Sequence, residues 1–235
     1  TKAVIAIRDT ADSKTWGSQR VNIFLKDLAS GTLNRIDFVS TKTEMGYSSS
    51  PEISNDGQKI IFVSDLDLTS EGATGQNIYL WDTANSFKLV NKKENGQRFT
   101  SNYGWHADLS GNGNKVAFQT GEALDPGDTN GVSDIYVKDL SSGKIVRASE
   151  NGSGGIYPRF SNDGEYIFYQ VYNMQDKYLK AYSLSSNERI DVPGVPATNS
   201  PSFSSESFVS IANDSGIFWT WKDYSADDTD GDADY

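Results

Sequence analysis

The sequence predicts an all-β fold, a β-propeller of about five blades in which each blade is a four-stranded antiparallel sheet. Two observations predict this fold. A turn signal, Asn55-Asp56-Gly57, lies between two strand-like runs, and similar units recur at intervals of roughly 40–55 residues. Runs such as 60–63 and 78–81 are apolar at consecutive positions, which indicates strands buried on both faces. Sheets stacked around an axis are buried in this way because each one covers its neighbour.

The second unit shows the strands of one blade in full. Its first strand covers 52–54, and a longer second strand covers 59–64 after a turn in which Asp and Gly accept positive φ. The third and fourth strands are predicted at 77–81 and 87–91, where β-branched and aromatic residues are bounded by turn formers.

Counterparts of these strands follow in the other units. We expect them at 2–9, 21–27 and 34–39 in the first unit, at 105–110, 115–119, 134–139 and 144–149 in the third, at 157–160, 166–170, 178–184 and 189–192 in the fourth, and at 200–204, 208–212 and 216–221 in the fifth. The first unit begins one strand late and the fifth has no evident fourth strand, so both terminal blades are predicted to be incomplete. The third unit has His106 where the others have proline. We divide the chain into a propeller domain, 1–224, and an acidic tail, 225–235.

Composition and charge narrow the classes of function. The chain has 235 residues, of which 36% are hydrophobic, enough to bury one sizeable core. It has no cysteine, which excludes disulfides and thiolate metal sites but leaves the compartment open. The formal net charge is −11, and because nucleic-acid binding needs a basic patch, we expect no nucleic-acid partner and a preference for cations. No apolar run is long enough to cross a membrane as a helix.

The repeated unit has a recognisable sequence pattern. Pro-x-[Phe/Ile]-Ser-x-Asp-Gly occurs at 51–57 and 158–164, and [Asp/Asn]-Ile-[Tyr/Phe]-x-x-Asp occurs at 22–27, 77–82 and 134–139. This pattern resembles the repeat of the TolB-type propellers, relatives of the WD-repeat proteins, over most of the chain.

The resemblance implies a non-catalytic binding or scaffolding module of a secreted or periplasmic bacterial protein, one that recognises a protein, a peptide or a glycan and is linked to further domains. Two alternatives stay open. A glycan-active hydrolase would need a pair of carboxylates in the channel, and the propeller domain of a peptidase would need a catalytic domain outside this chain. The sequence has no Gly-x-Ser-x-Gly nucleophile motif and only one histidine, which favours a protein that is not an enzyme.

An acidic loop between two predicted strands, 125–134, is a candidate calcium site. Asp125, Asp128, Asn130 and Asp134 place oxygen ligands close together, as hard cations require. The glycine spacing differs from that of an EF-hand. The alternative is a polar turn in which Asp134 holds backbone amides beside its strand.

The acidic tail is a second candidate calcium site. Asp228, Asp230, Asp232 and Asp234 alternate around Gly231 and resemble the calcium-binding Asp-x-Asp-Gly-Asp units of thrombospondin type 3 repeats. This resemblance implies the start of a calcium-binding linker, and calcium is therefore the predicted cofactor. The alternative is a disordered acidic tail.

Two further residues are candidate ligand contacts. His106 is the only histidine, and Trp105 and Leu109 beside it indicate an innermost strand that lines the channel. A structural role is the alternative for His106. Trp16, in a loop that also holds Lys14, is the candidate for an exposed recognition aromatic.

Several aspartates are expected to be structural. Asp56 and Asp163 recur at equivalent turns, and Asp27, Asp82 and Asp139 recur at strand ends. Because Asp side chains accept hydrogen bonds from nearby backbone amides, turn chemistry explains these residues without a catalytic role.

Overall fold

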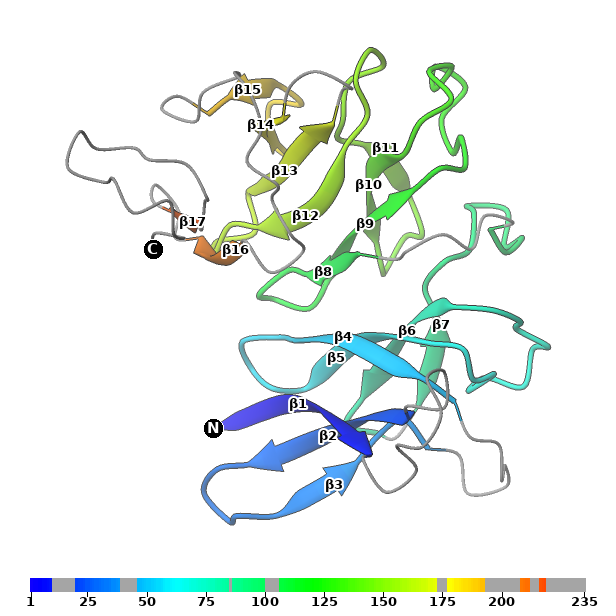
Figure 1. Ribbon diagram of the computed structural model, residues 1–235, viewed down its shortest axis with the longest axis vertical. Helices are drawn as coiled ribbons and strands as arrows, with labels where there is room; N and C mark the ends of the chain where they lie inside the picture. Colours follow the sequence, from blue (N-terminus) through cyan, green and yellow to red (C-terminus); the bar gives the residue numbers. More distant parts are fainter. Residues whose placement is uncertain are drawn as a thin grey trace, which may run out of the picture.

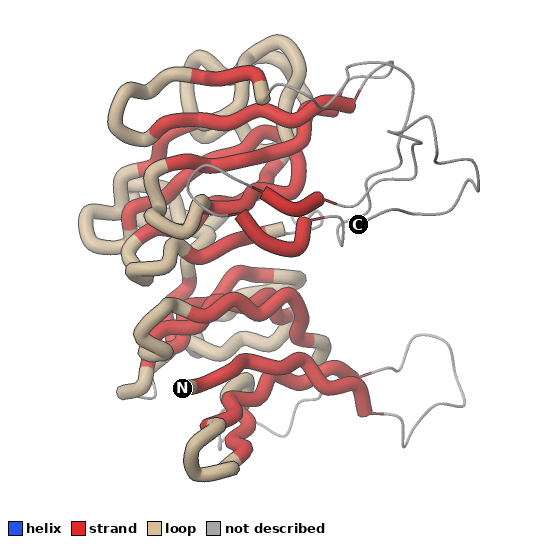
Figure 2. The backbone as a smooth tube through the Cα atoms, turned by 90° about the vertical axis from the view of Figure 1, so that its left-hand side faces the viewer, coloured by secondary structure: helices blue, strands red, loops and turns tan. Residues whose placement is uncertain are grey.

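The computed structural model describes residues 1–9, 20–38, 46–84, 86–99, 106–172, 177–192, 208–211 and 216–218. Trp16 and the acidic tail lie outside these ranges. All regular elements within the ranges are strands, seventeen in number, and they form five antiparallel sheets. Figure 2 shows these strands joined by loops and turns. The described residues contain no helix that could cross a membrane.

The five sheets follow the order of the chain, and we number them as blades 1 to 5. Blade 1 contains β1 (Lys2–Asp9), β2 (Arg20–Asp27) and β3 (Leu33–Arg35). Blade 2 contains β4 (Ser48–Ile53), β5 (Lys59–Ser64), β6 (Asn77–Asp82) and β7 (Phe87–Leu89). Blade 3 contains β8 (Ala107–Leu109), β9 (Lys115–Thr120), β10 (Asp134–Asp139) and β11 (Ile145–Arg147). Blade 4 contains β12 (Ile156–Phe160), β13 (Tyr166–Tyr172), β14 (Lys177–Ser183) and β15 (Arg189–Asp191). Blade 5 contains β16 (Phe208–Ile211) and β17 (Gly216–Phe218).

The sheets are arranged around a common centre (Figure 1). In blades 2, 3 and 4 each strand pairs with the next one along the chain, from β4, β8 or β12 on the inner side to β7, β11 or β15 on the outer side. The propeller architecture predicted from the repeats is confirmed. Blade 1 starts one strand late, as predicted. Blade 5 is described only in part, because its predicted first strand, 200–204, lies outside the described ranges.

The turn between the first two strands of a complete blade is held by a serine and an Asx side chain. In blade 2 the Ser54 hydroxyl donates to Asp56 Oδ1 at 2.6 Å and accepts the Lys59 N–H at 3.0 Å. Asp56 Oδ1 also accepts the Gln58 N–H at 2.9 Å, and Gly57 has a φ of 68°, which favours glycine. The corresponding turns of blades 3 and 4 have the same hydrogen bonds. The structural role predicted for these turn residues is confirmed.

The aspartates at the strand ends cap the turns that follow. Asp139 Oδ1 accepts the N–H groups of Ser141 and Ser142 at 3.0 and 2.8 Å. Asp27 and Asp82 cap their turns in the same way. Hydrogen bonds from serine hydroxyls and backbone amides lower the pKa of all three carboxyls. Their predicted structural role is therefore also confirmed.

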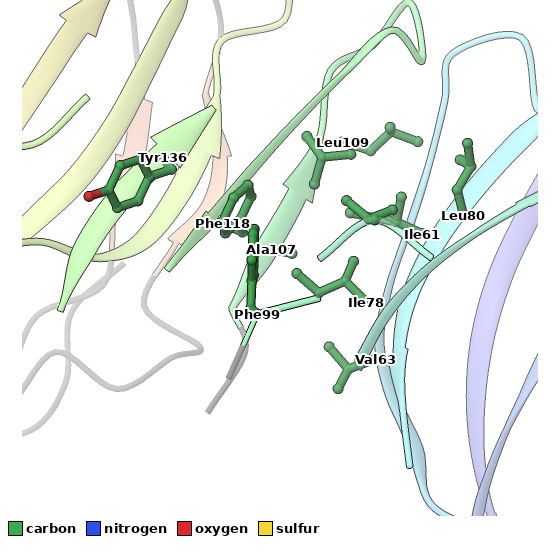
Figure 3. Close-up of a cluster of buried hydrophobic side chains, with 11 residues drawn as sticks. Ile61, Val63, Ile78, Leu80, Phe99, Ala107, Leu109, Phe118 and Tyr136 are labelled. Atoms are coloured by element: carbon green, nitrogen blue, oxygen red, sulfur yellow. The ribbon is translucent and has the colours of Figure 1, made fainter. Parts of the chain in front are cut away.

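The hydrophobic core lies between neighbouring blades. Along β5 the side chains alternate, so that Ile60 and Phe62 belong to the cluster shared with blade 1, while Ile61 and Val63 belong to the cluster shared with blade 3. Figure 3 shows the second cluster, with Ile61 and Val63 on one side and Phe118 of blade 3 on the other. The predicted burial of consecutive apolar residues on both faces is confirmed.

Blade 1 has a partly exposed face within the described residues. Ile5, Phe62 and Phe118 are each the fourth residue of β1, β5 and β9. Ile5 is 38% exposed, whereas both phenylalanines are 0% exposed. In the complete blades this face contacts the preceding blade, and blade 1 has no preceding blade in the described part of the chain.

Candidate functional site in the central channel

Three innermost strands each place a charged side chain at the same structural position. Glu52 on β4, Asp108 on β8 and Arg159 on β12 all pair with the third residue of the neighbouring strand in their own blade. We name these residues the charged trio. Because the first strand of each of these blades lies nearest the centre, the charged trio from three successive blades comes together there, where a propeller has its channel.

An ion pair joins blade 2 to blade 4 across the inner end of blade 3. Arg159 Nη1 lies 2.8 Å from Glu52 Oε1 and 3.7 Å from Asp108 Oδ1. Asp108 Oδ2 accepts the backbone N–H of Phe160 at 2.6 Å, which ties blade 3 to blade 4. The side chains of Glu52 and Arg159 are each 32% exposed, but that of Asp108 is only 11% exposed. The ion pair is therefore accessible to solvent, with a more deeply buried carboxylate next to it.

Burial sets the protonation of the two carboxyl groups. It raises the pKa of Glu52 to about 7, and the nearby Asp108 carboxylate adds to this rise while Arg159 opposes it. Burial also raises the pKa of Asp108, although Arg159 and backbone N–H groups favour the charged form. The site thus combines two acids with one fixed positive charge, and Glu52 changes its charge near neutral pH.

His106 and Tyr157 lie beside the charged trio. They come two residues before Asp108 and Arg159, and their ring centroids are 4.3 Å apart at an interplanar angle of 77°. Burial, with a smaller contribution from Arg159, lowers the pKa of His106, so the imidazole is neutral at pH 7. The structure therefore places His106 at the junction of blades 3 and 4, next to the charged residues.

The repeat proline produces a bulge in two of the inner strands. At Pro51 in β4 and Pro158 in β12 the register with the neighbouring strand shifts. The preceding residues, Ser50 and Tyr157, have φ values of 51° and 55°. Proline has no N–H for the ladder, so the extra residue is left unpaired and the strand bends.

The predicted alignment of His106 with the repeat prolines is wrong by one residue. Ala107 is the counterpart of Pro51 and Pro158, because it stands directly before the charged position and pairs regularly with β9. Alanine keeps the N–H that proline lacks, so the inner strand of blade 3 continues without a bulge. His106 corresponds to the residue that precedes the proline in the other blades.

The charged trio was not predicted from the sequence, although the sequence contains a signal for it. In the repeat pattern Pro-x-[Phe/Ile]-Ser, the variable position x is occupied by Glu52 and Arg159, and Asp108 has the same place in the third unit. A position that carries three different charged residues inside an otherwise regular repeat marks a surface on which the blades differ.

Two predicted calcium ligands, Asp125 and Asp128, accept hydrogen bonds from protein donors. Asp128 Oδ2 accepts the Tyr136 hydroxyl at 2.6 Å, and its Oδ1 lies 3.7 Å from Arg147 Nη1. Asp125 Oδ1 accepts the Gly127 N–H at 2.6 Å. The Arg147 guanidinium supplies positive charge beside Asp128, which weakens the case for a cation at the same place.

The other two predicted ligands in this loop are bonded to each other. Asn130 Nδ2 donates to Asp134 Oδ2 at 2.9 Å, and the Ser149 hydroxyl donates to the other oxygen of Asp134. Asn77 has the position of Asp134 in blade 2, and it accepts a hydrogen bond from Asn91 at 2.9 Å. A hydrogen bond between the third strand and the residues after the fourth therefore recurs in two blades. This favours a structural role for Asp134, although its donors are side chains and not the predicted backbone amides.

Calcium binding stays a prediction. No group of three His, Asp or Glu side chains that could hold a metal ion is found within the described ranges. The four tail residues, Asp228, Asp230, Asp232 and Asp234, lie outside those ranges, as does Trp16.

Thermal unfolding tests the calcium prediction. We expect millimolar calcium to raise the melting temperature, because a ligand that binds only the folded state stabilises it, by about 2.7 kcal/mol at a hundredfold excess over Kd. Asp128→Asn should reduce the rise if the loop binds calcium, and deletion of 225–235 should reduce it if the tail does. Sodium chloride at equal ionic strength is the control. Identical melting curves with calcium and with a chelator would contradict both sites.

Comparisons with known proteins agree with the fold. No family model matches the chain, and no curated protein matches its sequence. Among solved structures, TolB from Acinetobacter baumannii is 18% identical, with 84% of this chain and 41% of that chain covered and a TM-score of 0.55. A putative TolB from Agrobacterium tumefaciens is 18% identical, with coverage of 85% and 65% and a TM-score of 0.50. An oligogalacturonate lyase from Vibrio parahaemolyticus is 14% identical, with coverage of 74% and 48% and a TM-score of 0.50.

Identities this low show the fold alone. The sheets and the comparisons together define a β-propeller module. Its fold is similar to that of TolB, as the repeat pattern predicts. The chain spans between 41% and 65% of the length of these three proteins.

Proposed function

We propose that this chain is a non-catalytic binding module that recognises a protein, a peptide or a glycan at its central channel. The observation that carries the proposal is the charged trio. The turn and strand-end aspartates recur from blade to blade because the fold uses them in the same way each time. The charged trio instead differs between blades at one shared position on the channel surface, which supports a role in recognition.

The ion pair of the charged trio favours a peptide or protein partner. Glu52 and Arg159 present both signs of charge, and each side chain is 32% exposed. A peptide also carries both signs, so its side chains can form two intermolecular ion pairs in place of the internal one. Complementary charges of this kind give specificity and fast association.

The proposed location is secreted or periplasmic, and we also propose further domains in the same protein. Both proposals are supported by the resemblance of the repeat to TolB-type propellers. Fractionation of the native host with an antibody against this chain tests the location, and the size of the detected protein tests for further domains.

Selection from a displayed random-peptide library tests the channel site. We expect peptides enriched on the wild-type chain at pH 8, where Glu52 is largely ionised, to bind at least about tenfold more weakly to the double variant Glu52→Gln, Arg159→Gln, which removes both charges without changing the net charge. The matched control is Glu71→Gln, Lys92→Gln. That ion pair is also accessible, with side chains 42% and 28% exposed, and Lys92 follows the outer strand β7. Peptides that bind all three proteins equally would contradict a site in the channel.

A glycan-active hydrolase is the second candidate, because the channel holds a carboxylate pair, Glu52 and Asp108. A pKa of about 7 for Glu52 suits a general acid. Arg159 contacts both carboxylates, however, which favours the binding proposal. Turnover of a polysaccharide panel that is lost in Glu52→Gln would replace the binding proposal with an enzymatic one. The peptidase alternative concerns a catalytic domain outside this chain.

A further inference from the structure

A repeated lysine contact joins neighbouring blades, and we name it the lysine latch. The first residue of a blade's second strand, or of β1, which has that position in blade 1, donates from Nζ to the carbonyl of the turn glycine in the next blade. Lys2 Nζ lies 3.3 Å from Gly57 O, and Lys59 Nζ lies 2.8 Å from Gly113 O. Lys59 Nζ also donates to Asn114 Oδ1 at 3.2 Å. The lysine latch thus closes the junction of blades 1 and 2 and that of blades 2 and 3.

The lysine latch is not formed between blades 3 and 4. Lys115 and Gly164 have the two equivalent positions, but no hydrogen bond joins them in the structure of the described residues. Both instead line a cleft of about 490 Å³ between the two blades. The junction therefore contains an open volume and an ammonium group that lacks the acceptor found at the other two junctions.

Glu165 gives a physical reason for the open junction. It has the position of Asn114, whose side chain accepts the second hydrogen bond of the lysine latch in blade 3. Glu165 Oε1 instead accepts the Ser183 hydroxyl and the Ser185 N–H, both at 3.0 Å. These bonds hold the carboxylate against its own blade, so it makes no ion pair with Lys115.

The cleft combines apolar and polar lining. Its apolar side chains are Val137, Val146 and Leu184. Its polar lining residues other than Lys115 and Glu165 are Asp139, Ser142 and Lys144 from blade 3 and Ser185 and Asn187 from blade 4.

The charged groups of the lining differ in their hydrogen bonding. Lys115 and Lys144 donate through their backbone N–H groups, and their ammonium groups have no partner in the described part of the chain. The Asp139 carboxylate accepts hydrogen bonds within its own turn, and the Glu165 carboxylate accepts them from Ser183 and Ser185 at the end of β14; these bonds lower the pKa of each group. The cleft therefore has two positive and two negative side chains beside an apolar surface, and only the two ammonium groups lack a hydrogen-bond partner among the described residues.

We propose that this cleft binds the carboxylate of a peptide and packs the peptide's adjoining aliphatic side chain against Val146 and Leu184, which are only partly buried. The Lys115 ammonium group is not engaged by the turn glycine carbonyl, and a carboxylate gives it a charge-assisted hydrogen bond that is stronger than one to a neutral carbonyl. Lys144 supplies a second positive charge. The site is separate from the channel, because no member of the charged trio lines it.

N-acetyl-L-leucine is a suitable probe, because it joins a carboxylate to an aliphatic side chain. Added to the isotope-labelled full chain and followed by NMR, it should shift the amide signals of Val137, Lys144 and Gly164 with saturable, millimolar affinity. N-acetyl-L-leucinamide lacks the carboxylate and acetate lacks the side chain, so each should bind at least about tenfold more weakly. Equal binding of the amide, or shifts confined to channel residues, would overturn the proposal.

Two variants with the same change of charge locate the interaction. Lys115→Gln should weaken binding of N-acetyl-L-leucine about tenfold, because it removes the charge-assisted hydrogen bond. Lys88→Gln, at an exposed position on β7, should change the affinity less than about twofold. Equal affinity for the Lys115→Gln variant and the wild-type chain would overturn the proposal.

Thermal unfolding shows whether Lys115 is already engaged in solution. Lys59→Gln breaks a formed lysine latch and should lower the melting temperature by about 2–4 °C. Lys115→Gln should leave the melting temperature unchanged, because its ammonium group holds no partner. An equal fall for Lys115→Gln would show that its lysine latch is formed, and would overturn the proposal.

Discussion

Replacing Phe118 with alanine should lower the free energy of unfolding by about 3–5 kcal/mol. Its side chain is fully buried, and its ring centroid lies 5.5 Å from that of Phe99 and 6.2 Å from that of Tyr136. The cluster continues across the junction to Ile61 and Val63 of blade 2 (Figure 3). The loss has two causes, since the ring is no longer removed from water and a cavity forms between two blades that cannot fully collapse.

Equilibrium unfolding in urea measures this loss, and Ile5→Ala is the matched control. Ile5 has the same position in blade 1 but is 38% exposed, so its truncation should cost less than about 1 kcal/mol. A loss below about 1 kcal/mol for Phe118→Ala would contradict a core that lies between the blades. An equally large loss for Ile5→Ala would show that the exposed face of blade 1 is covered in solution.

The fold could be predicted because its signals are local. The turn from Ser54 to Lys59 and the consecutive apolar residues of β5 can be recognised from neighbours in the sequence alone. The arrangement of the sheets follows from the repetition of this unit. A small sheet with two apolar faces must be covered on both sides, so repeated sheets pack against one another. The strand-end aspartates could be interpreted correctly for the same reason, since each one caps a turn within a few residues of itself.

The charged trio depends on contacts that the sequence does not display. Glu52 and Arg159 are separated by 107 residues, and only the curvature of the ring brings blade 4 close enough to blade 2 for them to meet. The error over His106 has a related cause. Ala107 stands where blades 2 and 4 have the proline that marks the start of the repeat. Without that proline, the sequence has no local signal that distinguishes Ala107 from His106 as its counterpart.

The acidic loop illustrates a second limit of prediction from sequence. The sequence shows that Asp128 and Asp134 carry oxygen ligands, but it does not show which donors face them. Tyr136 lies on β10 and Arg147 on β11, and both reach Asp128 only because these two strands pair beside the loop. Whether carboxylates are available to a cation is therefore decided by strand pairing and not by their spacing alone.

Replacing Arg159 with methionine should lower the free energy of unfolding by about 2 kcal/mol at pH 8. The change leaves Glu52 and Asp108 without their positive partner, and the expected cost is below that of a fully buried pair because Arg159 is 32% exposed. The loss should be smaller at pH 5. Burial raises the pKa of both acids, so between about pH 4 and pH 7 the folded state binds protons that the unfolded state has released. The free energy of unfolding therefore falls as pH rises from about 4 to 7. Because Arg159 lowers the pKa of both acids, its loss shifts this range to higher pH.

Glu52→Gln in the Arg159→Met background tests this explanation directly. It removes the group whose pKa is about 7 and should restore about 1 kcal/mol at pH 8, measured by urea unfolding at both pH values. Lys92→Met is the matched control, because it breaks an accessible ion pair with Glu71 and should cost less than about 1 kcal/mol at either pH. If Arg159→Met lowers stability equally at pH 5 and pH 8, uncompensated carboxylates are not the cause, and the loss belongs to the contacts of the arginine stem.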